Sequence, residues 1–474
     1  MKLFKQPALI IKVFLIYAKA ILFFTVGLYF FILPSIRSIT LITSKQLKTG
    51  QIHPYYFQLH QKLTENYQKW LTERLVSNRA TELSVHDISG TEWPLFGTAF
   101  YLWSTESLQK AWEQNRSLAP HAPREYASES ITLAAKLLTD PKQAHWVKLK
   151  WGDDYLKKEN LFYRMLLISG LTSYQKLSGN QQYRDMLADQ VNSLAREIDQ
   201  SPYGLLDDYP GECYPIDILP AIVAIKKADA LLGIDHAEFI ARARRGFQSA
   251  ILDPETKLPA YICDSKKGIG IGPARGTGIS YMLMWAPELW PEIAQDWYGK
   301  YEDKYWQRDW FLAGWREFAK NSHNPNWYLE VDAGPVIAGY GTAASAFGLG
   351  AALVNGRMDQ AYPLLAESLI FSWPLPNETF LTPKLLSNLS DAPFLGESAL
   401  LFVLTRVSSH MTNNQSTHMP GSVVLILTIN FLIGVILILF SLKSLKRDTI
   451  KSFIWLKKSF SKDYGESKYR ERKI

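Results

Sequence analysis

Two apolar stretches, one near each end of the chain, limit what this sequence can fold into. The second, Val423 to Leu442, is aliphatic and aromatic except for single Thr, Asn and Ser residues. About 20 such residues are what a helix needs to cross the hydrocarbon core of a bilayer. The first runs from Val13 to Leu33 and contains Lys19 near its start, where a lysine can extend its ammonium group to the headgroups. We expect two membrane-spanning helices.

Charge indicates which side of the membrane each part occupies. Residues 443–474 contain eleven Lys or Arg and four Asp or Glu, so this tail carries a net +7, which equals the net charge of the whole chain. Basic residues beside a span favour the cytoplasmic side, and Lys2, Lys5 and Lys12 agree. We therefore expect a two-pass protein of the cell (inner) membrane, with both termini cytoplasmic and the central domain outside. A cleaved signal peptide is the alternative for the first stretch, although no small-residue cleavage pattern follows it.

The same charge sum bears on partners. Outside the basic tail the chain is neutral, so its high pI does not indicate a nucleic-acid-binding domain, and the tail is a candidate contact for anionic lipids.

Helical periodicity dominates between the spans, and apolar helices alternate with more polar ones. We expect an all-α fold, an (α/α)6 toroid, with inner helices beginning near Tyr126, Asn160, Gly211, Gly276, Asp332 and Gly396. The expected segments are an anchor (1–37), a juxtamembrane stalk helix (38–90), the toroid (91–410), the second span (421–442) and the tail (443–474).

Metal and nucleotide signatures are missing from the sequence. The histidines are scattered without an HExxH motif or zinc-type Cys/His spacing, and we expect neither a metal nor a cofactor. The glycine-rich run from Gly268 to Gly278 lacks the Lys-Ser/Thr ending of a P-loop. It predicts a hairpin that leads to a helix N-terminus, where Arg275 is a candidate for holding an anionic substrate group.

The chain has only two cysteines, Cys213 and Cys263. In an oxidising compartment they could form a disulfide, which would add about 4 kcal/mol on the chain-entropy account. Two free, buried thiols are the alternative, because sequence alone cannot bring their Cα atoms within bonding range.

Acidic residues are densest just before an apolar helix. The segment Leu206-Asp-Asp-Tyr-Pro-Gly-Glu-Cys-Tyr-Pro-Ile-Asp217 holds four carboxylates and two tyrosines. Paired carboxylates in an apolar cavity separate their pKa values, which gives one acid and one base. We take Asp208, Glu212 and Asp217 as candidate catalytic residues, with Tyr209 and Tyr214 as candidate substrate contacts. Helix capping and the helix dipole are the structural alternative for such residues.

Two further segments fit the same pattern. Asp332, followed by Gly-Pro and small residues, predicts a helix start and is a fourth catalytic candidate, although capping would also explain it. Glu159, Asn160 and Tyr163 open another inner helix, where Asn160 and Tyr163 share a face. These three are candidate substrate-binding residues.

The chain also resembles a known family over Trp151 to Leu365. The likeness rests on short motifs in order, namely Trp151-Gly-Asp153, Lys158-Glu159-Asn160-x-x-Tyr163, Leu177-Ser-Gly179-Asn-x-x-Tyr183, Tyr209-Pro210, Asp253-Pro254-Glu255 and Asp332-x-Gly334. They are similar to bacterial linalool dehydratase/isomerase. The resemblance implies an (α/α)6 fold that handles small monoterpene alcohols without a metal or organic cofactor. Asp208 and Asp217 stand where that family has its two active-site cysteines, and Leu166 stands where it has a histidine, so the acid/base set is replaced.

These observations leave three functions open. The first is a membrane-anchored enzyme, lyase- or hydratase-like, that uses carboxylates as acid and base on a lipid-like or isoprenoid substrate. The second is a glycan-active hydrolase or lyase of the cell envelope, which also needs a proton donor and acceptor. The third is a non-catalytic envelope scaffold or binding subunit. A convergence of the predicted acidic residues on one aromatic pocket would favour an enzyme.

Overall fold

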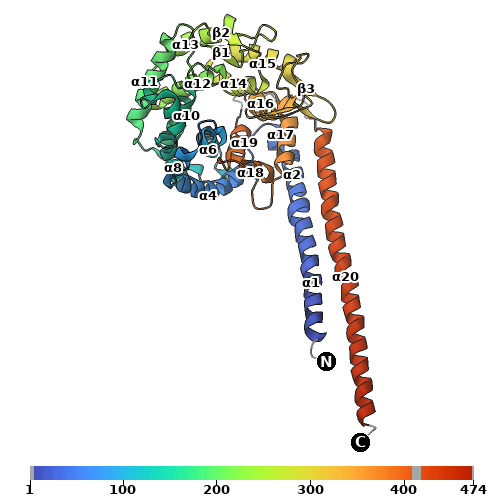
Figure 1. Ribbon diagram of the computed structural model, residues 1–474. Coiled ribbons are helices and arrows are strands. Elements are labelled where there is room, and N and C mark those ends of the chain that lie inside the picture. The colour runs from blue at the N-terminus through green and yellow to red at the C-terminus, as the bar shows by residue number, and fades with distance from the viewer. Residues whose placement is uncertain (1–4, 408–417, 472–474) are drawn as a thin grey trace. The chain divides into compact units, whose positions relative to one another are not determined.

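The computed structural model describes residues 5–407 and 418–471 of the chain. Helices make up most of the described residues and a few short strands interrupt them (Figure 1), which confirms the expected helical fold class. The chain divides into two compact units. The smaller comprises residues 1–40, 374–376 and 423–474, and the larger comprises residues 41–373 and 377–422. Lys2 and the predicted boundary at residue 410 lie outside the described residues.

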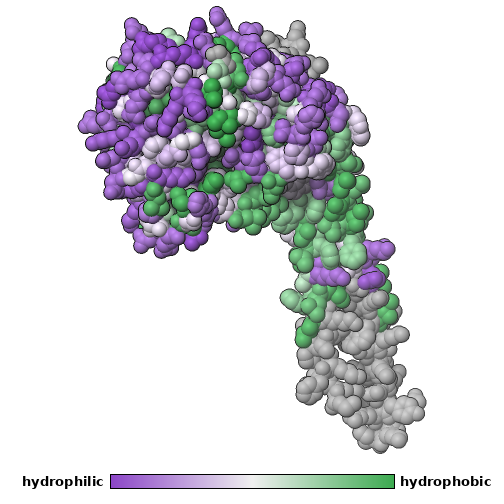
Figure 2. Space-filling model, turned by 45° about the horizontal axis from the view of Figure 1, so that its top comes forward, coloured by the Kyte–Doolittle hydropathy of each residue, from purple (hydrophilic) through white to green (hydrophobic). Residues whose placement is uncertain are grey.

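The smaller unit is built on two helical segments. At the amino-terminal end, α1 (Lys5–Val26), a π-helical turn (Gly27–Ile32) and α2 (Leu33–Thr43) follow one another, and at the other end α20 runs over Gly421–Glu471. The stretches Phe14–Thr43 and Gly421–Arg447 are long and apolar enough to cross a membrane. Hydrophobic side chains cover much of the described surface here (Figure 2). The second span does not end as a separate helix at residue 442, because α20 continues through most of the basic tail.

The two apolar segments of this unit pack against each other. A Cβ added to Gly27 would lie 2.9 Å from the carbonyl oxygen of Gly434, so the close approach depends on glycine. Small residues serve this purpose between membrane helices, where backbones must come near one another. The rings of Phe23 and Phe440 meet edge to face at 5.2 Å, and the Ser441 hydroxyl donates to the carbonyl of Ala20 at 2.7 Å.

The larger unit contains the remaining helices. Its α-helices are α3 (Lys45–Lys48), α4 (Pro54–Val76), α5 (Arg79–Glu82), α6 (Ile88–Gln114), α7 (Pro123–Tyr126), α8 (Ser128–Thr139), α9 (His145–Trp151), α10 (Leu161–Ser178), α11 (Arg184–Gln200), α12 (Pro215–Leu232), α13 (Ala237–Ala243), α14 (Gly276–Leu289), α15 (Pro291–Tyr305), α16 (Thr342–Val354), α17 (Met358–Ser372), α18 (Leu381–Ser387) and α19 (Leu395–Leu404). Short 3-10 turns lie at Arg116–Leu118, Tyr155–Lys157, Arg244–Phe247 and Ser249–Ile251.

Among the described residues, the helices α6, α10, α12, α14, α16 and α19 form a closed circuit of neighbours. Each packs on the next in this order, and α19 packs back on α6. All of them are largely buried, as the apolar character of their sequences predicts. Helix α8, whose start near Tyr126 was expected to open an inner helix, packs outside the circuit on α4, α6 and α10. Its expected place is taken by α6.

Small residues let neighbouring elements approach closely. A Cβ on Gly348 of α16 would collide with the Trp315 indole, and one on Gly276 would lie 1.9 Å from the carbonyl oxygen of Arg316. The hydroxyl of Ser280 in α14 donates to the carbonyl of Ala344 in α16 at 2.7 Å. Small residues of α14 and α16 therefore serve helix packing.

Short antiparallel strands lie between these helices. They are β1 (Ile262–Asp264) with β2 (Ile269–Ile271), β3 (Trp306–Arg308) with β4 (Ala313–Trp315), and β5 (Tyr328–Glu330) with β6 (Gly334–Ile337) and β7 (Tyr340–Gly341). The hairpin predicted from the glycine-rich run is confirmed, and α14 follows it. The helix start predicted at Asp332 is wrong. Asp332 lies in the turn between β5 and β6, and α16 begins at Thr342.

The segment expected to form a stalk also has a different place. Helix α4 buries Tyr56, Leu63 and Tyr67 against the rest of the larger unit, where it packs on α8 and α19. Its polar residues form only the outward face of an amphipathic helix. The segment is therefore part of the larger compact unit and not a separate stalk.

Candidate active site

The acidic loop before α12 is held in shape by its own side chains. The Asp207 carboxylate accepts hydrogen bonds from the Gly211 amide at 2.8 Å and the Ser265 hydroxyl at 2.6 Å. The Asp208 carboxylate accepts one from the Tyr214 amide at 2.9 Å. Pro215 is the first residue of α12, where its fixed φ favours the helix and no amide donor is needed. Asp207 thus shapes the loop and does not cap α12, whose N-cap residue is Tyr214.

Asp208 and Asp217 form a close pair with perturbed acidity. Burial raises the pKa of Asp208 well above its usual value, and the nearby Asp217 carboxylate raises it further. Asp208 is almost fully buried, and within the described part of the chain its Oδ1 atom has no hydrogen-bond partner. Burial also raises the pKa of Asp217, with added repulsion from Asp332 and Glu92. The pair therefore retains a proton at pH values where an ordinary aspartate is ionised.

Opposing effects act on the pKa of Asp217, because the helix dipole lowers it while burial and neighbouring negative charges raise it. Asp217 lies in the first turn of α12, where the helix dipole favours a charged carboxylate by about 0.3–1 kcal/mol. Its pKa is nevertheless raised, because desolvation and neighbouring negative charges outweigh the dipole. Neighbouring buried carboxyls whose pKa values are raised are suited to acid catalysis, because at least one of them keeps its proton.

Asp332 reaches this cluster from the β5–β6 turn. The Tyr261 hydroxyl donates a hydrogen bond of 2.9 Å to Oδ2 of Asp332. The Arg275 guanidinium lies over the Tyr261 ring at 4.5 Å and pairs with the buried Glu317 carboxylate at 2.7 Å. It also pairs with Glu330. Arg275 is therefore a member of an ion-pair network that supports Tyr261, and its predicted contact with an anionic substrate stays a prediction.

Glu92 is a member of the cluster that was not predicted from the sequence. Burial raises the pKa of Glu92 to about 6, against the opposing effects of a hydrogen bond from Tyr209 and the charge of Lys150. The Lys150 ammonium lies 3.5 Å from the centroid of the Tyr209 ring. The position of Glu92 in the second turn of α6, at the start of a buried aromatic helix, is the signal that could have revealed it.

An aromatic surface adjoins the carboxylates. The negative charge of Asp217 contributes to the raised pKa of the buried Tyr281 hydroxyl, after burial itself. The Tyr281 ring contacts Phe347 at 5.2 Å and Phe96 at 6.0 Å, and Phe96 contacts Phe162 at 5.6 Å. Phe96 and Phe347 are only partly buried. These four residues, which we call the aromatic floor, come from α6, α10, α14 and α16 of the closed circuit.

The remaining predicted residues of the loop lie at its exposed side. Glu212 is exposed and accepts a hydrogen bond of 3.1 Å from the Tyr214 hydroxyl. The Tyr214 ring meets the Tyr261 ring edge to face at 5.7 Å. The charge of Glu212 also contributes to the raised pKa of Glu92, although less than burial does. Glu212 and Tyr214 thus lie at the rim of the carboxylate cluster.

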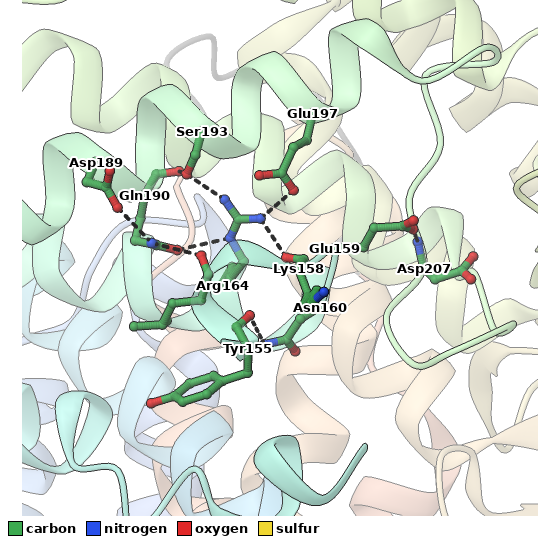
Figure 3. A network of polar contacts seen from close by, with 11 residues as sticks. Tyr155, Lys158, Glu159, Asn160, Arg164, Asp189, Gln190, Ser193, Glu197 and Asp207 are labelled. Carbon is green, nitrogen blue, oxygen red and sulfur yellow. Dashed lines mark hydrogen bonds and ion pairs between the residues drawn. The ribbon is translucent and has the colours of Figure 1, made fainter. Parts of the chain in front are cut away.

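Glu159, Asn160 and Tyr163 make structural contacts beside the acidic loop, and Figure 3 shows the first two. The Glu159 carboxylate accepts a hydrogen bond of 2.7 Å from the Asp207 amide, which ties the loop to the start of α10. The Asn160 amide donates to the Tyr155 carbonyl at 3.3 Å, and the buried Tyr163 hydroxyl donates to the Leu138 carbonyl at 2.8 Å. No hydrogen bond or ion pair among the described residues joins these three side chains to the carboxylate cluster. Their predicted contact with substrate stays a prediction.

A buried arginine fixes this corner of the unit. Arg164 is fully buried, and its guanidinium donates to Gln190, Ser193, Glu197 and the Lys158 carbonyl (Figure 3). A buried charge that donates four hydrogen bonds holds α10, α11 and the preceding loop in one arrangement. Glu159 is thus presented to the acidic loop from a rigid base.

The two cysteines lie side by side under the acidic loop. Cys213 and Cys263 are both buried, with their Sγ atoms 3.0 Å apart, and the Cys263 amide donates to the Cys213 carbonyl at 2.9 Å. The hydrogen bond between the two thiols and burial raise the pKa of the Cys213 thiol. Both cysteines are buried, so neither is an exposed nucleophile.

After burial, Asp332 and Glu92 raise the pKa of Asp217, and Asp217 raises that of Asp208, so these four carboxyls form one cluster. Glu212, the other predicted acid, lies at its rim. In residues 5–407 and 418–471, no group of three His, Cys, Asp or Glu side chains has the spacing to hold a metal ion. No protein-family model and no curated protein sequence matches the chain.

Proposed function

We propose that the larger unit is an (α/α)6 toroid with an acid/base active site formed by Asp208, Asp217, Glu92 and Asp332. The closed circuit of six described helices supports the toroid, because α/α barrels bury their core in such a ring. The single observation that carries the site is the buried Asp208 carboxyl, whose Oδ1 atom has no hydrogen-bond partner among the described residues and whose pKa is raised by burial and by the nearby Asp217. A carboxyl that keeps its proton above the usual pKa of an aspartate can act as a general acid.

The surroundings favour an apolar substrate. Aromatic side chains form the adjoining floor, and aromatic faces stabilise a cation that lies over them. An allylic or tertiary carbocation formed from an isoprenoid would benefit from this contact, whereas a sugar would need polar partners for several hydroxyl groups. We therefore propose a lyase- or hydratase-like activity on a lipid-like or isoprenoid alcohol, in keeping with the family resemblance noted from the sequence.

The proposed reaction is a reversible dehydration. The Asp208–Asp217 pair donates its proton to the hydroxyl oxygen of the substrate, the C–O bond breaks, and water leaves with the bonding electrons. Glu92, whose pKa of about 6 leaves it mostly ionised at pH 7, removes a proton from the adjacent carbon as the C=C bond forms. Proton exchange through the released water restores both groups. The reverse sequence hydrates an alkene.

The proposed location follows from the two apolar segments and the charge of the tail. Two membrane spans would hold the larger unit against the bilayer, and the positive-inside rule would place that unit outside the cytoplasm. An enzyme held there has access to isoprenoid lipids of the membrane.

Turnover by the purified full chain tests the proposal. The protein in detergent micelles is incubated with allylic isoprenoid alcohols, and loss of water is followed by gas chromatography and mass spectrometry. We expect alkene formation that falls by at least about 100-fold in Asp217→Asn and in Glu92→Gln, which is the usual contribution of general acid or base catalysis. Asp185→Asn, which changes an exposed aspartate in the first turn of α11, is the matched control. Release of reducing sugars from envelope glycans with the alcohols untouched would favour the glycan alternative, and no turnover of either would favour the scaffold.

A further inference from the structure

The β5–β6 hairpin exposes one apolar face. The register of β5 pairs Leu329 with Pro335 of β6, which places the two side chains on one side of the hairpin. Trp327 and Val331 flank β5 in the chain and are exposed as well. Trp327 is 68% exposed and Leu329 is 78% exposed. Ile337, the next outward residue of β6, is also exposed. The polarity of the hairpin is therefore the reverse of that expected for a strand pair on a water-soluble protein.

The opposite, inner side of the hairpin carries the residues that attach it to the larger unit. Glu330 pairs with Arg275, and the Tyr328 ring contacts Phe318 at 6.1 Å. Val336 is buried. The hairpin is thus anchored to the larger unit by its inner side, and its outer apolar side is not needed for that attachment. Contiguous exposed apolar surface of this kind marks a site of interaction with a protein or a membrane.

The neighbouring strands indicate whether a protein or a membrane covers this exposed apolar face. The backbone of Arg316, directly after β4, forms an antiparallel β-bridge with Tyr340 of β7. The β3–β4 sheet therefore adjoins the β5–β7 sheet. In the loop between β3 and β4, Trp310 is 76% exposed and its carbonyl accepts a hydrogen bond of 2.9 Å from the Gly421 amide. The Phe311 carbonyl accepts one from the Ser422 amide at 2.9 Å.

These two hydrogen bonds fix the β3–β4 loop at the start of the second candidate span. The apolar run of α20 begins at Val423, directly after Ser422. Tryptophan is enriched at the headgroup level of membrane proteins, and an exposed tryptophan bonded to the first residue of a candidate span has the place in the chain expected of such a residue. The outer side of the β5–β6 strands, with Leu329, Pro335 and Ile337, carries no charged residue.

We propose that the outer face of the β5–β6 hairpin, formed by Trp327, Leu329, Val331, Pro335 and Ile337, docks into the headgroup region of the bilayer. Apolar burial of such side chains is favourable by about 25 cal/mol per Å² removed from water. The docking itself is independent of the reaction. If the proposed function also holds, the docked hairpin places its Asp332 turn at the membrane surface, so an isoprenoid substrate could pass from the bilayer to the carboxylate cluster.

Depth-dependent quenching tests the docking in the full chain. Leu329→Cys is labelled with the environment-sensitive fluorophore NBD, and the protein is reconstituted in vesicles of phosphatidylethanolamine and phosphatidylglycerol with nitroxide lipids labelled near the headgroup. Wild type controls for labelling, because Cys213 and Cys263 are buried. Gln182→Cys is the matched exposed site, beyond the C-terminal end of α10 and hence at the opposite end of that helix from the acidic loop.

We expect a blue-shifted emission and the loss of most of its intensity at position 329, with little change at position 182. Equal quenching at the two positions, or none at 329, would overturn the proposal. Nanodiscs that hold a single chain distinguish a bilayer from a second copy of the chain. A signal at 329 that vanishes in them would also overturn membrane docking. None of these readouts needs turnover, so a failure of the proposed reaction leaves this test intact.

Discussion

The Tyr261 hydroxyl donates a 2.9 Å hydrogen bond to Asp332, and this contact joins two hairpins that are far apart in the sequence. Tyr261 precedes β1, whereas Asp332 lies in the β5–β6 turn. Asp332 is exposed, so without this bond nothing in its own turn would direct it at the Asp208–Asp217 pair. The Arg275 guanidinium over the Tyr261 ring fixes the donor in turn.

Tyr261→Phe should therefore loosen Asp332 while keeping the ring packed. We expect a loss of about 1 kcal/mol in the free energy of unfolding, the usual net value of one such hydrogen bond, together with reduced turnover. Thermal unfolding in detergent and initial rates measure the two effects. Tyr203→Phe, at an exposed tyrosine, is the control and should leave both unchanged. Equal losses in the two variants would contradict a specific role for the Tyr261–Asp332 bond.

The sequence predicted the carboxylate cluster better than it predicted the elements that hold it. Asp208 and Asp217 could be predicted because a group of acidic residues directly before an apolar helix is easily recognised in the sequence. Asp332 was found for a wrong reason, since Gly-Pro and small residues predict a helix start equally well as a strand turn. Its convergence with Asp217 depends on the Tyr261 contact, which lies 71 residues away in the chain and leaves no local pattern.

Other parts could not be predicted because burial decides them. The sequence of α4 is amphipathic and fits a stalk on a membrane as well as an outer helix of a compact unit. Which neighbour covers its apolar face is a tertiary property. Glu92 was overlooked because a single carboxylate in an aromatic helix has no partner nearby in the sequence, and only the fold brings Tyr209 and Lys150 to it.

The Asp208–Asp217 pair should reduce stability as the pH rises. Burial first, and then the Asp217 charge, raise the pKa of Asp208 in the folded state, so its stabilising contribution is complete below the pKa of the unfolded chain. That contribution is lost as the pH rises through the folded pKa. Asp208→Asn removes the titration, and we expect it to be more stable than wild type at pH 8 by at least about 1 kcal/mol, yet less active.

Unfolding of both proteins between pH 5 and pH 8 measures the effect of this substitution. The control is Asp185→Asn, whose stability should follow the wild-type pH curve. A variant that is less stable than wild type at every pH would show that Asp208 is needed for folding in its ionised form, which would contradict its proposed role as a proton donor.

Glu367 should make a second pH-dependent contribution to stability close to neutrality. Its Oε1 atom accepts from the Ala313 amide at 3.1 Å and the Ser422 hydroxyl at 3.2 Å, and burial raises the pKa of Glu367 to about 7. Because the pKa of Glu367 is higher in the folded state than in the unfolded chain, its carboxyl stabilises the fold most when it is protonated. The contribution is complete below about pH 4.5 and is lost as the pH rises through 7, by about 3 kcal/mol in total.

Glu367→Gln should keep the packing and flatten stability over this range. Thermal unfolding midpoints in detergent from pH 5 to pH 8 give the comparison with wild type. Glu238→Gln, which changes a highly exposed glutamate on α13, should retain the wild-type slope. If the slope persists in Glu367→Gln, another group is responsible for it.

We expect the Cys213 and Cys263 thiols to be inaccessible to alkylating reagents in the native protein and to form a disulfide readily during oxidative refolding. Both residues are buried, so we expect no alkylation of the native reduced protein and alkylation of both after unfolding. A disulfide donor present during refolding should oxidise the two thiols to one bond and be reduced itself, because the fold brings the two Sγ atoms to 3.0 Å. On the chain-entropy account the bond would stabilise the fold by about 4 kcal/mol. Mass spectrometry after alkylation distinguishes the two states, and Cys263→Ser, which cannot form the bond, is the control.

Orientation in the membrane is open to a direct test that also bears on these thiols. If the basic tail is cytoplasmic, a protease added to intact spheroplasts should cut loops of the larger unit and leave an epitope at residue 474 attached to a protected fragment. Permeabilised cells should lose the epitope as well, because the tail is rich in lysine and arginine. Loss of the epitope in intact spheroplasts with the larger unit uncut would invert the topology. The carboxylate cluster would then face the cytoplasm, where thioredoxin and glutathione keep cysteines reduced, and Cys213 and Cys263 would remain thiols in the cell.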